Sequence, residues 1–185
     1  MSTKIRSVLL SLFSVAVVLF AAGVARADGV VIAPSALGKA ESNVRAIIEA
    51  ERAKNADAFQ EVAKVRAELR TLDENKRGRL AVLTPRLKAL GSGAVWAMAE
   101  ELAVDAKPRG SLPDAAWLAW RISLLEATGM LRDARTEPVM KAILDSKQAD
   151  FEVVKAAAEA LARLATDGAA SKLVTLAESK SSKRK

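Results

Sequence analysis

The chain has 185 residues, 51% hydrophobic and 28% charged, so it can bury a core and lacks the composition of a disordered protein. It contains no His, Cys or Tyr, which excludes Ser-His-Asp and Cys-His catalytic sites, the usual zinc ligands, disulfides and a lipidated cysteine. A hard cation held by carboxylates would still be compatible with this composition. Aromatic residues make up only 4%, so the core must use Ala, Leu, Val and Ile, which favours packed helices.

Residues 1–27 have the three parts of a secretory signal. Lys4 and Arg6 precede an apolar run over residues 8–24, and the Ala-Arg-Ala sequence at residues 25–27 has the small-x-small pattern of a cleavage site. We therefore expect export to the periplasm or the exterior, followed by cleavage. The alternative is an uncleaved membrane anchor, because an apolar run of about 17 residues is at the short limit of what spans a bilayer.

The excess positive charge of the chain lies at its two ends. The signal holds three Lys and Arg residues and no acid, so the mature chain has 26 cations and 22 anions. Four of these cations lie in the last six residues, which leaves 22 charges of each sign over residues 28–179. A neutral body does not indicate a nucleic-acid-binding face, and we expect no nucleic acid among the partners. Residues 179–185 contain no apolar side chain and are expected to form a basic, disordered tail.

Residues 28–75 are expected to form an extended lead-in and a helical hairpin. The lead-in runs to about Gly38, because Pro34 disfavours helix at the residue before it. Apolar residues then recur every three or four positions in two series, which predict helices over residues 36–54 and 57–74. A coiled-coil arm is the alternative, but a heptad pattern does not persist for long enough.

Residues 76–178 are expected to form further helices. Each of them begins at a capping residue or after a break that contains Gly or Pro. The capping residues are Thr84, Ser111, Thr136, Asp150 and Asp167. No segment alternates with period two for long enough to form a strand, so the pattern predicts an all-α protein.

These later helices contain an internal repeat. A shift of 33 residues superposes residues 126–147 on residues 159–180 without a gap, and Glu126 then falls on Glu159. The repeated unit is a helix, a short turn and a second helix. Such a pair buries its apolar face only by stacking on a neighbour, so the repeat predicts a stack of helix pairs.

Residues 151–165 and the segment 173–176 resemble a HEAT-like repeat of the short kind found in phycobiliprotein lyases. Residues 125–144 and 87–102 resemble it less closely. The resemblance covers about residues 76–178 and implies a short α-solenoid of HEAT-like helix pairs that binds other proteins and has no activity of its own. Lyase activity is not implied, because the resemblance covers only the scaffold. Tetratricopeptide repeats are the alternative, but their Trp- and Tyr-containing signature is absent.

Stacked pairs also predict where a partner binds. The second helices of the pairs would line one inner face, on which Glu101, Lys141 and Lys172 are the expected polar contacts. Phe151 and Leu161 are expected to pack between the layers instead.

Two further groups are candidate partner-binding residues. Trp117 and Trp120 lie three positions apart on one helix face, where they either fill the core or line the groove of the stack. Arg77 and Arg79 belong to a run of cations without an acid over residues 76–88. That run is either a solvated helix face or a patch for an acidic protein or an anionic envelope polymer.

Glu100, Glu101 and Asp105 form the acidic cluster most relevant to catalysis, and Glu101 and Asp105 share a helix face. Sugar-stacking aromatics are missing nearby, and a catalytic interpretation would need a deep polar pocket with a carboxylate of raised pKa.

We therefore expect an exported, non-catalytic scaffold that binds a protein partner and holds no cofactor or metal. The alternative is a structural envelope component, tethered to an anionic polymer or a membrane surface by its basic tail or by an uncleaved signal.

Overall fold

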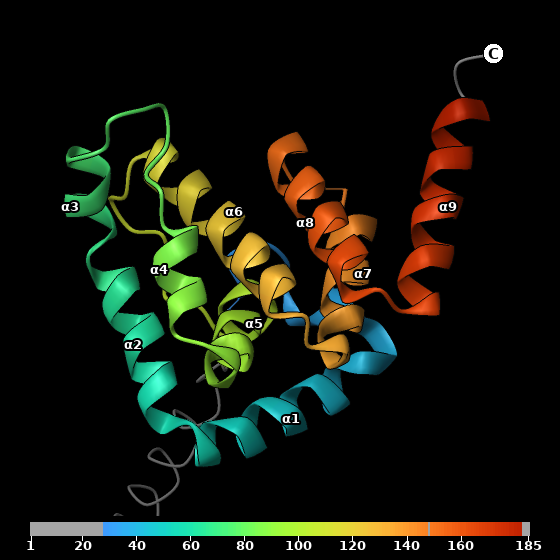
Figure 1. The fold of residues 1–185 in the computed structure, drawn as a ribbon, viewed down its shortest axis with the longest axis horizontal. Coiled ribbons are helices and arrows are strands. Elements are labelled where there is room, and N and C mark those ends of the chain that lie inside the picture. Colours follow the sequence, from blue (N-terminus) through green and yellow to red (C-terminus); the bar gives the residue numbers. More distant parts are fainter. Residues whose placement is uncertain (1–27, 148, 183–185) are drawn as a thin grey trace, which may run out of the picture.

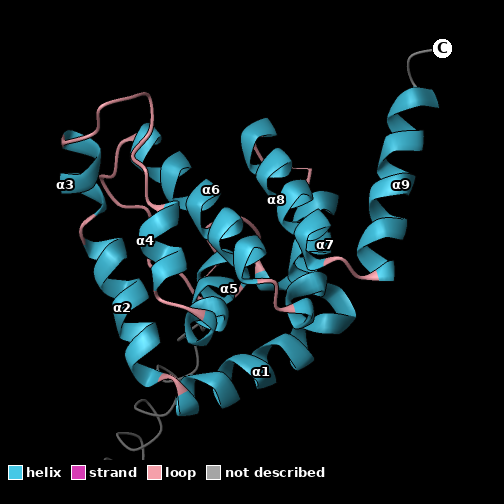
Figure 2. Ribbon diagram, viewed as in Figure 1, coloured by secondary structure: helices cyan, strands magenta, loops and turns pink. Residues whose placement is uncertain are grey.

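The computed structural model describes residues 28–147 and 149–182 of the chain. All regular structure in these residues is helical, and no strand occurs among them (Figure 1, Figure 2). The predicted all-α fold class is therefore confirmed. No helix in the described ranges is long and apolar enough to cross a membrane. The predicted signal, residues 1–27, and residues 183–185 of the predicted tail lie outside the described residues.

Short helices form the first part of the described chain. In chain order they are the 3-10 helix η1 (Pro34–Ala40), α1 (Glu41–Lys54), α2 (Ala56–Ala67) and α3 (Leu69–Glu74). The second half of the expected lead-in is thus helical, because Pro34 occupies the first turn of η1, where its missing N–H costs nothing. The first half packs closely on α5 (Val95–Ala103), where a Cβ on Gly29 would lie 2.4 Å from the main chain of Ala103.

The expected helical hairpin does not form. Its two helices, α1 and α2, run in different directions in Figure 1, and both pack on α5. Only Asn55 links them, whereas antiparallel helices are usually joined by about two to five residues. Their buried residues Val44, Ile48, Val62 and Val65 belong to the same core as the later helices, so the predicted boundary at residue 75 does not separate two cores.

The later helices pack in a regular order. After α3 the chain forms α4 (Thr84–Ala89), the 3-10 helix η2 (Ser92–Ala94), α5, α6 (Asp114–Leu131), the 3-10 helix η3 (Ala134–Thr136), α7 (Glu137–Asp145), α8 (Phe151–Leu164) and α9 (Asp167–Ser182). Helices α4, α6 and α8 lie next to one another in that order, while α5 packs on α6 and α7 packs on α8 (Figure 1). Small residues bring α6 and α8 together, because a Cβ on Gly129 would lie 2.5 Å from the Cα of Ala160. Since α9 ends at Ser182, the first residues of the expected disordered tail are helical.

Two turns that the 33-residue repeat relates have the same backbone conformation. Arg132 after α6 has φ 56° and ψ 35°, and Ala165 after α8 has φ 54° and ψ 35°. This left-handed conformation is uncommon for residues other than glycine. The next residue in each turn caps the following helix, since Asp133 accepts the N–H of Arg135 at 3.0 Å and Thr166 accepts that of Ala169 at 3.1 Å. The repeat therefore relates the two turns in structure as well as in sequence.

The core face of α8 differs from the predicted one at its first residue. Leu161 is completely buried, as predicted, but Phe151 is 74% exposed. Val153 and Ala157 fill the core instead. Apolar residues occupy several faces of this Ala-rich helix, so their spacing alone could not identify the face that packs.

Candidate functional site

The inner face expected from the sequence is partly covered in the structure. Its residues Glu101, Lys141 and Lys172 lie on α5, α7 and α9, but α1 packs on α5 and η1 packs on α7. Lys141 forms an ion pair with Glu137, and Lys172 forms one with Asp145. The three residues therefore do not form one continuous polar surface, because the N-terminal segment lies over the helices that carry two of them.

The candidate tryptophans differ in their exposure. Trp120 is completely buried, so it fills the core and presents no surface to a partner. Trp117 is half-buried, and the guanidinium of Arg66 lies 4.7 Å from its ring centroid. Of the two predicted roles, filling the core and lining a groove, Trp120 therefore has the first.

The candidate arginines lie elsewhere, on the segment between α3 and α4. Arg79 is largely exposed and lies 3.5 Å from a carboxylate oxygen of Glu152 on α8. Arg77 is exposed and has no ion pair with any described residue. Neither residue lines the cleft that contains Glu101.

A cleft of about 380 Å³ lies between α2, α5 and the loop that follows α5. Phe59 and Val62 of α2 form part of its apolar wall. The polar residues that line it are Arg52, Glu100, Glu101, Asp105 and Lys107. The guanidinium of Arg52 stacks 4.3 Å from the Phe59 ring centroid and pairs with Glu100, so one side of the cleft is held in place by these contacts.

Glu101 lines the cleft, and its buried Oε2 has no hydrogen bond among the described residues. Its side chain is only 13% exposed, and burial raises its pKa to about 7. Arg66 opposes this rise, but its Nε lies 3.9 Å from Oε2, too far for a hydrogen bond. Burial also raises the pKa of Glu100, an effect that its ion pair with Arg52 partly offsets. The cleft thus places a carboxylate that titrates near neutral pH beside an apolar wall.

The polar groups behind Glu101 are incompletely paired as well. Arg66 is buried and donates from Nη2 to the carbonyls of Lys107 and Pro108 at 3.0 and 3.3 Å, while its Nε and Nη1 have no hydrogen bond among the described residues. Trp120 Nε1 lies close enough to Glu101 to lower its pKa without forming a well-directed hydrogen bond. Unpaired buried polar groups are rare in native structures, so this cluster needs an explanation.

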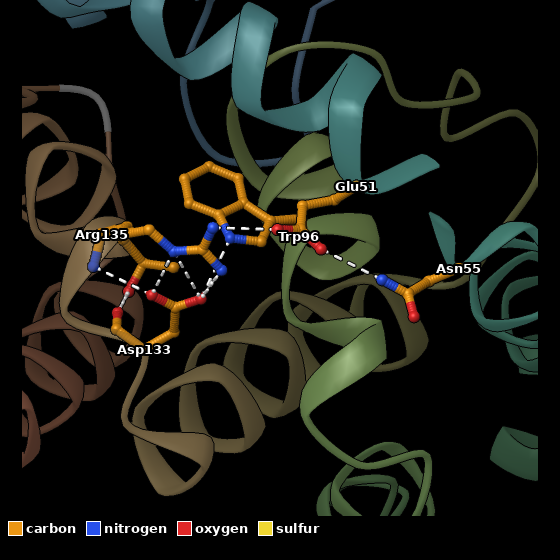
Figure 3. Close-up of polar contacts among 6 residues, drawn as sticks. Glu51, Asn55, Trp96, Asp133 and Arg135 are labelled. Carbon is orange, nitrogen blue, oxygen red and sulfur yellow. Dashed lines mark hydrogen bonds and ion pairs between the residues drawn. The ribbon is translucent and has the colours of Figure 1, made fainter. Parts of the chain in front are cut away.

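A second polar cluster has the same residue types but is fully paired (Figure 3). Asp133 accepts the indole N–H of buried Trp96 at 3.1 Å and the guanidinium of Arg135 at 2.6 Å. Arg135 also donates to Glu51 at 2.9 Å, and Glu51 accepts from Asn55 at 3.0 Å. Burial alone would raise the pKa of Asp133, but the hydrogen bonds it accepts lower it. This cluster ties α1 and α5 to the turn after α6, which is a structural role.

The sequence pattern indicated Glu101 as a candidate but not Arg66. The signal was present, because Arg66 lies within the apolar series of α2 and α3, four positions after Val62 and three before Leu69. A charged residue at such a position must either be buried beside a polar partner or bury only its aliphatic part and keep its charged group at the surface.

No family model, no curated protein and no solved structure matches this chain. Among the described residues, no group of three or more acidic side chains is arranged to hold a metal ion. The assignment of the candidate site therefore rests on the geometry of the cleft and its polar cluster.

Proposed function

We propose that this chain is an exported, non-catalytic helical-repeat scaffold that binds a protein partner in the cleft beside Glu101. The ordered packing of α4, α6 and α8 and the two equivalent turns at Arg132 and Ala165 support a short α-solenoid of helix pairs. The three-part signal in residues 1–27 supports export, and N-terminal sequencing of the mature protein tests it.

The observation that carries the binding role is the place of Glu101 in the wall of the cleft, with an Oε2 that is buried, lies 3.9 Å from Arg66 Nε and has no hydrogen bond. A buried carboxylate with too few hydrogen bonds costs free energy, and a donor from a bound partner to the Glu101 carboxylate would reduce that cost. The adjacent Phe59 and Val62 offer apolar surface. The combination fits a Lys or Arg side chain, which packs its aliphatic part on such a wall and donates at its end.

A carboxylate with a pKa of about 7 could also act as a general acid or base. The neighbouring carboxylate, Glu100, is held in an ion pair by Arg52 and is not free to act as its counterpart. A binding role requires only the one acceptor, and we assign that role to Glu101.

Site-specific photo-crosslinking tests the proposal. A photoreactive residue in place of exposed Lys107, at the rim of the cleft, should form a discrete adduct with a partner in producing cells. The same residue in place of exposed Lys155, on α8, should not form this adduct. Glu101→Gln should weaken the Lys107 adduct. An adduct that is equally strong from both positions, or that is unchanged by Glu101→Gln, would contradict the proposal.

A further inference from the structure

Helix α8 has a free face opposite the face that packs on α6. Phe151, Ala158 and Ala162 share this free face, because their spacings of seven and eleven residues are close to two and three whole turns. Ala160 lies about two and a half turns after Phe151, so it points the other way, where it packs closely against Gly129 of α6. Phe151 is 74% exposed, Ala162 is exposed and Ala158 is partly buried. We call Phe151, Ala158 and Ala162 the outer face of α8.

The 33-residue repeat indicates what would cover this outer face. The shift places Ala162 at the position of Gly129, the α6 residue on which α8 packs. It also places Leu173 of α9 at the position of Met140, which is completely buried on α7, a helix that packs on α8. Leu173 is only partly buried, because no described helix covers α8 and α9 as α8 covers α6 and α7. The stack therefore ends with an open position for one more helix.

A hollow of about 280 Å³ lies in this open position, where α8 ends and α9 begins. Its lining includes Ala162, Ala165, Ala169 and Leu173, whose mostly small side chains leave room for an aromatic ring. Helix α9 diverges from α8 after the turn that joins them (Figure 1). A large apolar side chain from another molecule would therefore gain apolar contact in the hollow.

The charges beside the outer face match a second copy of the same helix. Glu152, Lys155, Glu159 and Arg163 follow one another with alternating sign along one flank of α8. Lys155 and Glu159 have side chains 67% and 45% exposed and lie 3.9 Å apart, so both are accessible to a further partner. If two α8 helices pack antiparallel and cross near Ala158, Lys155 lies beside Glu159 of the second copy. Glu152 then lies beside Arg163 of the second copy, so all four positions face the opposite charge.

The same arrangement places Phe151 at the hollow of the second copy. Phe151 lies seven residues before Ala158 and Ala165 lies seven residues after it. Antiparallel helices that cross near Ala158 therefore bring Phe151 of one copy to Ala165 of the other, where the hollow lies. The protruding ring and the hollow complement each other, and a two-fold axis makes this contact twice.

We propose that this chain forms a two-fold symmetric dimer in which the outer faces of two α8 helices pack antiparallel, with Phe151 of each copy in the hollow of the other. The same surface serves both copies, so the interface closes at two chains and does not extend into a filament. None of these residues lines the cleft beside Glu101. The dimer is therefore a property of the chain beyond its proposed binding of another protein.

Sedimentation equilibrium of the mature protein tests the dimer. A dimer is expected at micromolar concentrations, and Phe151→Ser should raise its dissociation constant about tenfold or more, because two aromatic rings lose their apolar contact. Val82→Ser is the matched control, since Val82 is 82% exposed but lies outside α8 and should not affect the dimer. A wild-type chain that stays monomeric, as expected if a helix of a different protein fills the open position, would overturn the proposal. So would a Phe151→Ser variant that dimerises as wild type does.

Two charge reversals test the antiparallel arrangement. Lys155→Glu and Glu159→Lys should each weaken the dimer severalfold, because each places like charges side by side. An equal mixture of the two variants should associate more strongly than either variant alone, because the mixed dimer again has opposite charges at both positions. Both side chains are exposed, so the helix content by circular dichroism should not change. A mixture that associates no better than its separate components would overturn the proposal.

The dimer and the cleft can fail independently. A photoreactive residue at Lys155 is expected to join two copies of this chain, which gives an adduct of twice the chain mass. The adduct expected from Lys107 contains a different protein, so the two products are distinguished by mass.

Discussion

The two polar clusters of this protein contain the same residue types, but the pKa of the carboxylate is lowered in one and raised in the other. Each has an arginine over a tryptophan ring, Arg135 over Trp96 at 5.5 Å and Arg66 over Trp117 at 4.7 Å, and each has a part-buried carboxylate. The carboxylate of Asp133 accepts several hydrogen bonds and its pKa is lowered, whereas Glu101 has an unpaired oxygen and a raised pKa.

The difference follows from how far apart the paired residues lie in the sequence. Asp133 and Arg135 are two residues apart in one turn, so the turn itself sets the geometry of their hydrogen bonds. Arg66 and Glu101 come from different helices, α2 and α5, whose separation is fixed by the apolar contacts between them. Packing leaves these two groups 3.9 Å apart beside a cleft. Complete pairing marks a structural cluster, and incomplete pairing at a cleft marks a candidate site.

The largest effect is expected at the paired cluster. Asp133→Ala removes the acceptor of the Trp96 indole and leaves the Arg135 charge without its main partner, which should cost about 3 kcal/mol of unfolding free energy. Urea denaturation at pH 7 measures this cost. Asp114→Ala is the control, because its largely exposed ion pair with Arg109 should contribute less than about 1 kcal/mol. Equal costs for the two variants would mean that the cluster is not structural.

A smaller, pH-dependent effect is expected at Glu101. The folded pKa of about 7 lies above the ordinary value of 4.5, so ionisation of this buried carboxyl destabilises the wild type as the pH rises from 4.5 through 7. The side chain in the Glu101→Gln variant cannot ionise, so the variant does not lose this stability as the pH rises. The unfolding free energy of Glu101→Gln relative to wild type should therefore increase by about 2 kcal/mol between pH 5 and pH 8. A relative stability that does not change with pH would show that burial does not perturb Glu101.

The smallest effect separates two equally buried tryptophans. Trp96 donates its indole N–H to Asp133, whereas Trp120 Nε1 has no well-formed hydrogen bond. Both lose the same volume on substitution by Phe, but Trp96→Phe also removes a hydrogen bond. Its cost should exceed that of Trp120→Phe by about 1 kcal/mol in urea denaturation. If Trp120→Phe cost as much or more, the indole of Trp120 would be paired after all.

The sequence predicted the helices better than it predicted their packing. The sequence placed the start of α8 correctly at Phe151, but the Asp150 side chain at the N-cap position accepts no main-chain N–H and pairs with Arg121 instead. Apolar spacing could not show that Phe151 faces solvent, because an Ala-rich helix has apolar residues on several sides. It also could not show that α1 and α2 pack on α5, since periodicity identifies an apolar face without identifying what covers it.

The candidate site was predictable only in part. Glu101 stood out as a member of an acidic cluster, but its pKa depends on burial beneath segments that are distant in sequence. Val30 at the start of the described chain contacts the Glu101 main chain, and Arg66 approaches from α2. Contacts between such distant segments leave no local pattern, so the cleft appears only once the chain is folded.

The most direct test is a side-by-side titration of the two carboxylates by ¹³C NMR of the side-chain carboxyl carbons. Glu101 should titrate with a midpoint near pH 7, and Asp133 should titrate below its ordinary value of 3.8. That result would establish that one cluster is electrostatically satisfied and the other is not. A midpoint for Glu101 near 4.5, or one for Asp133 above that of Glu101, would contradict the distinction between a structural cluster and the proposed binding site.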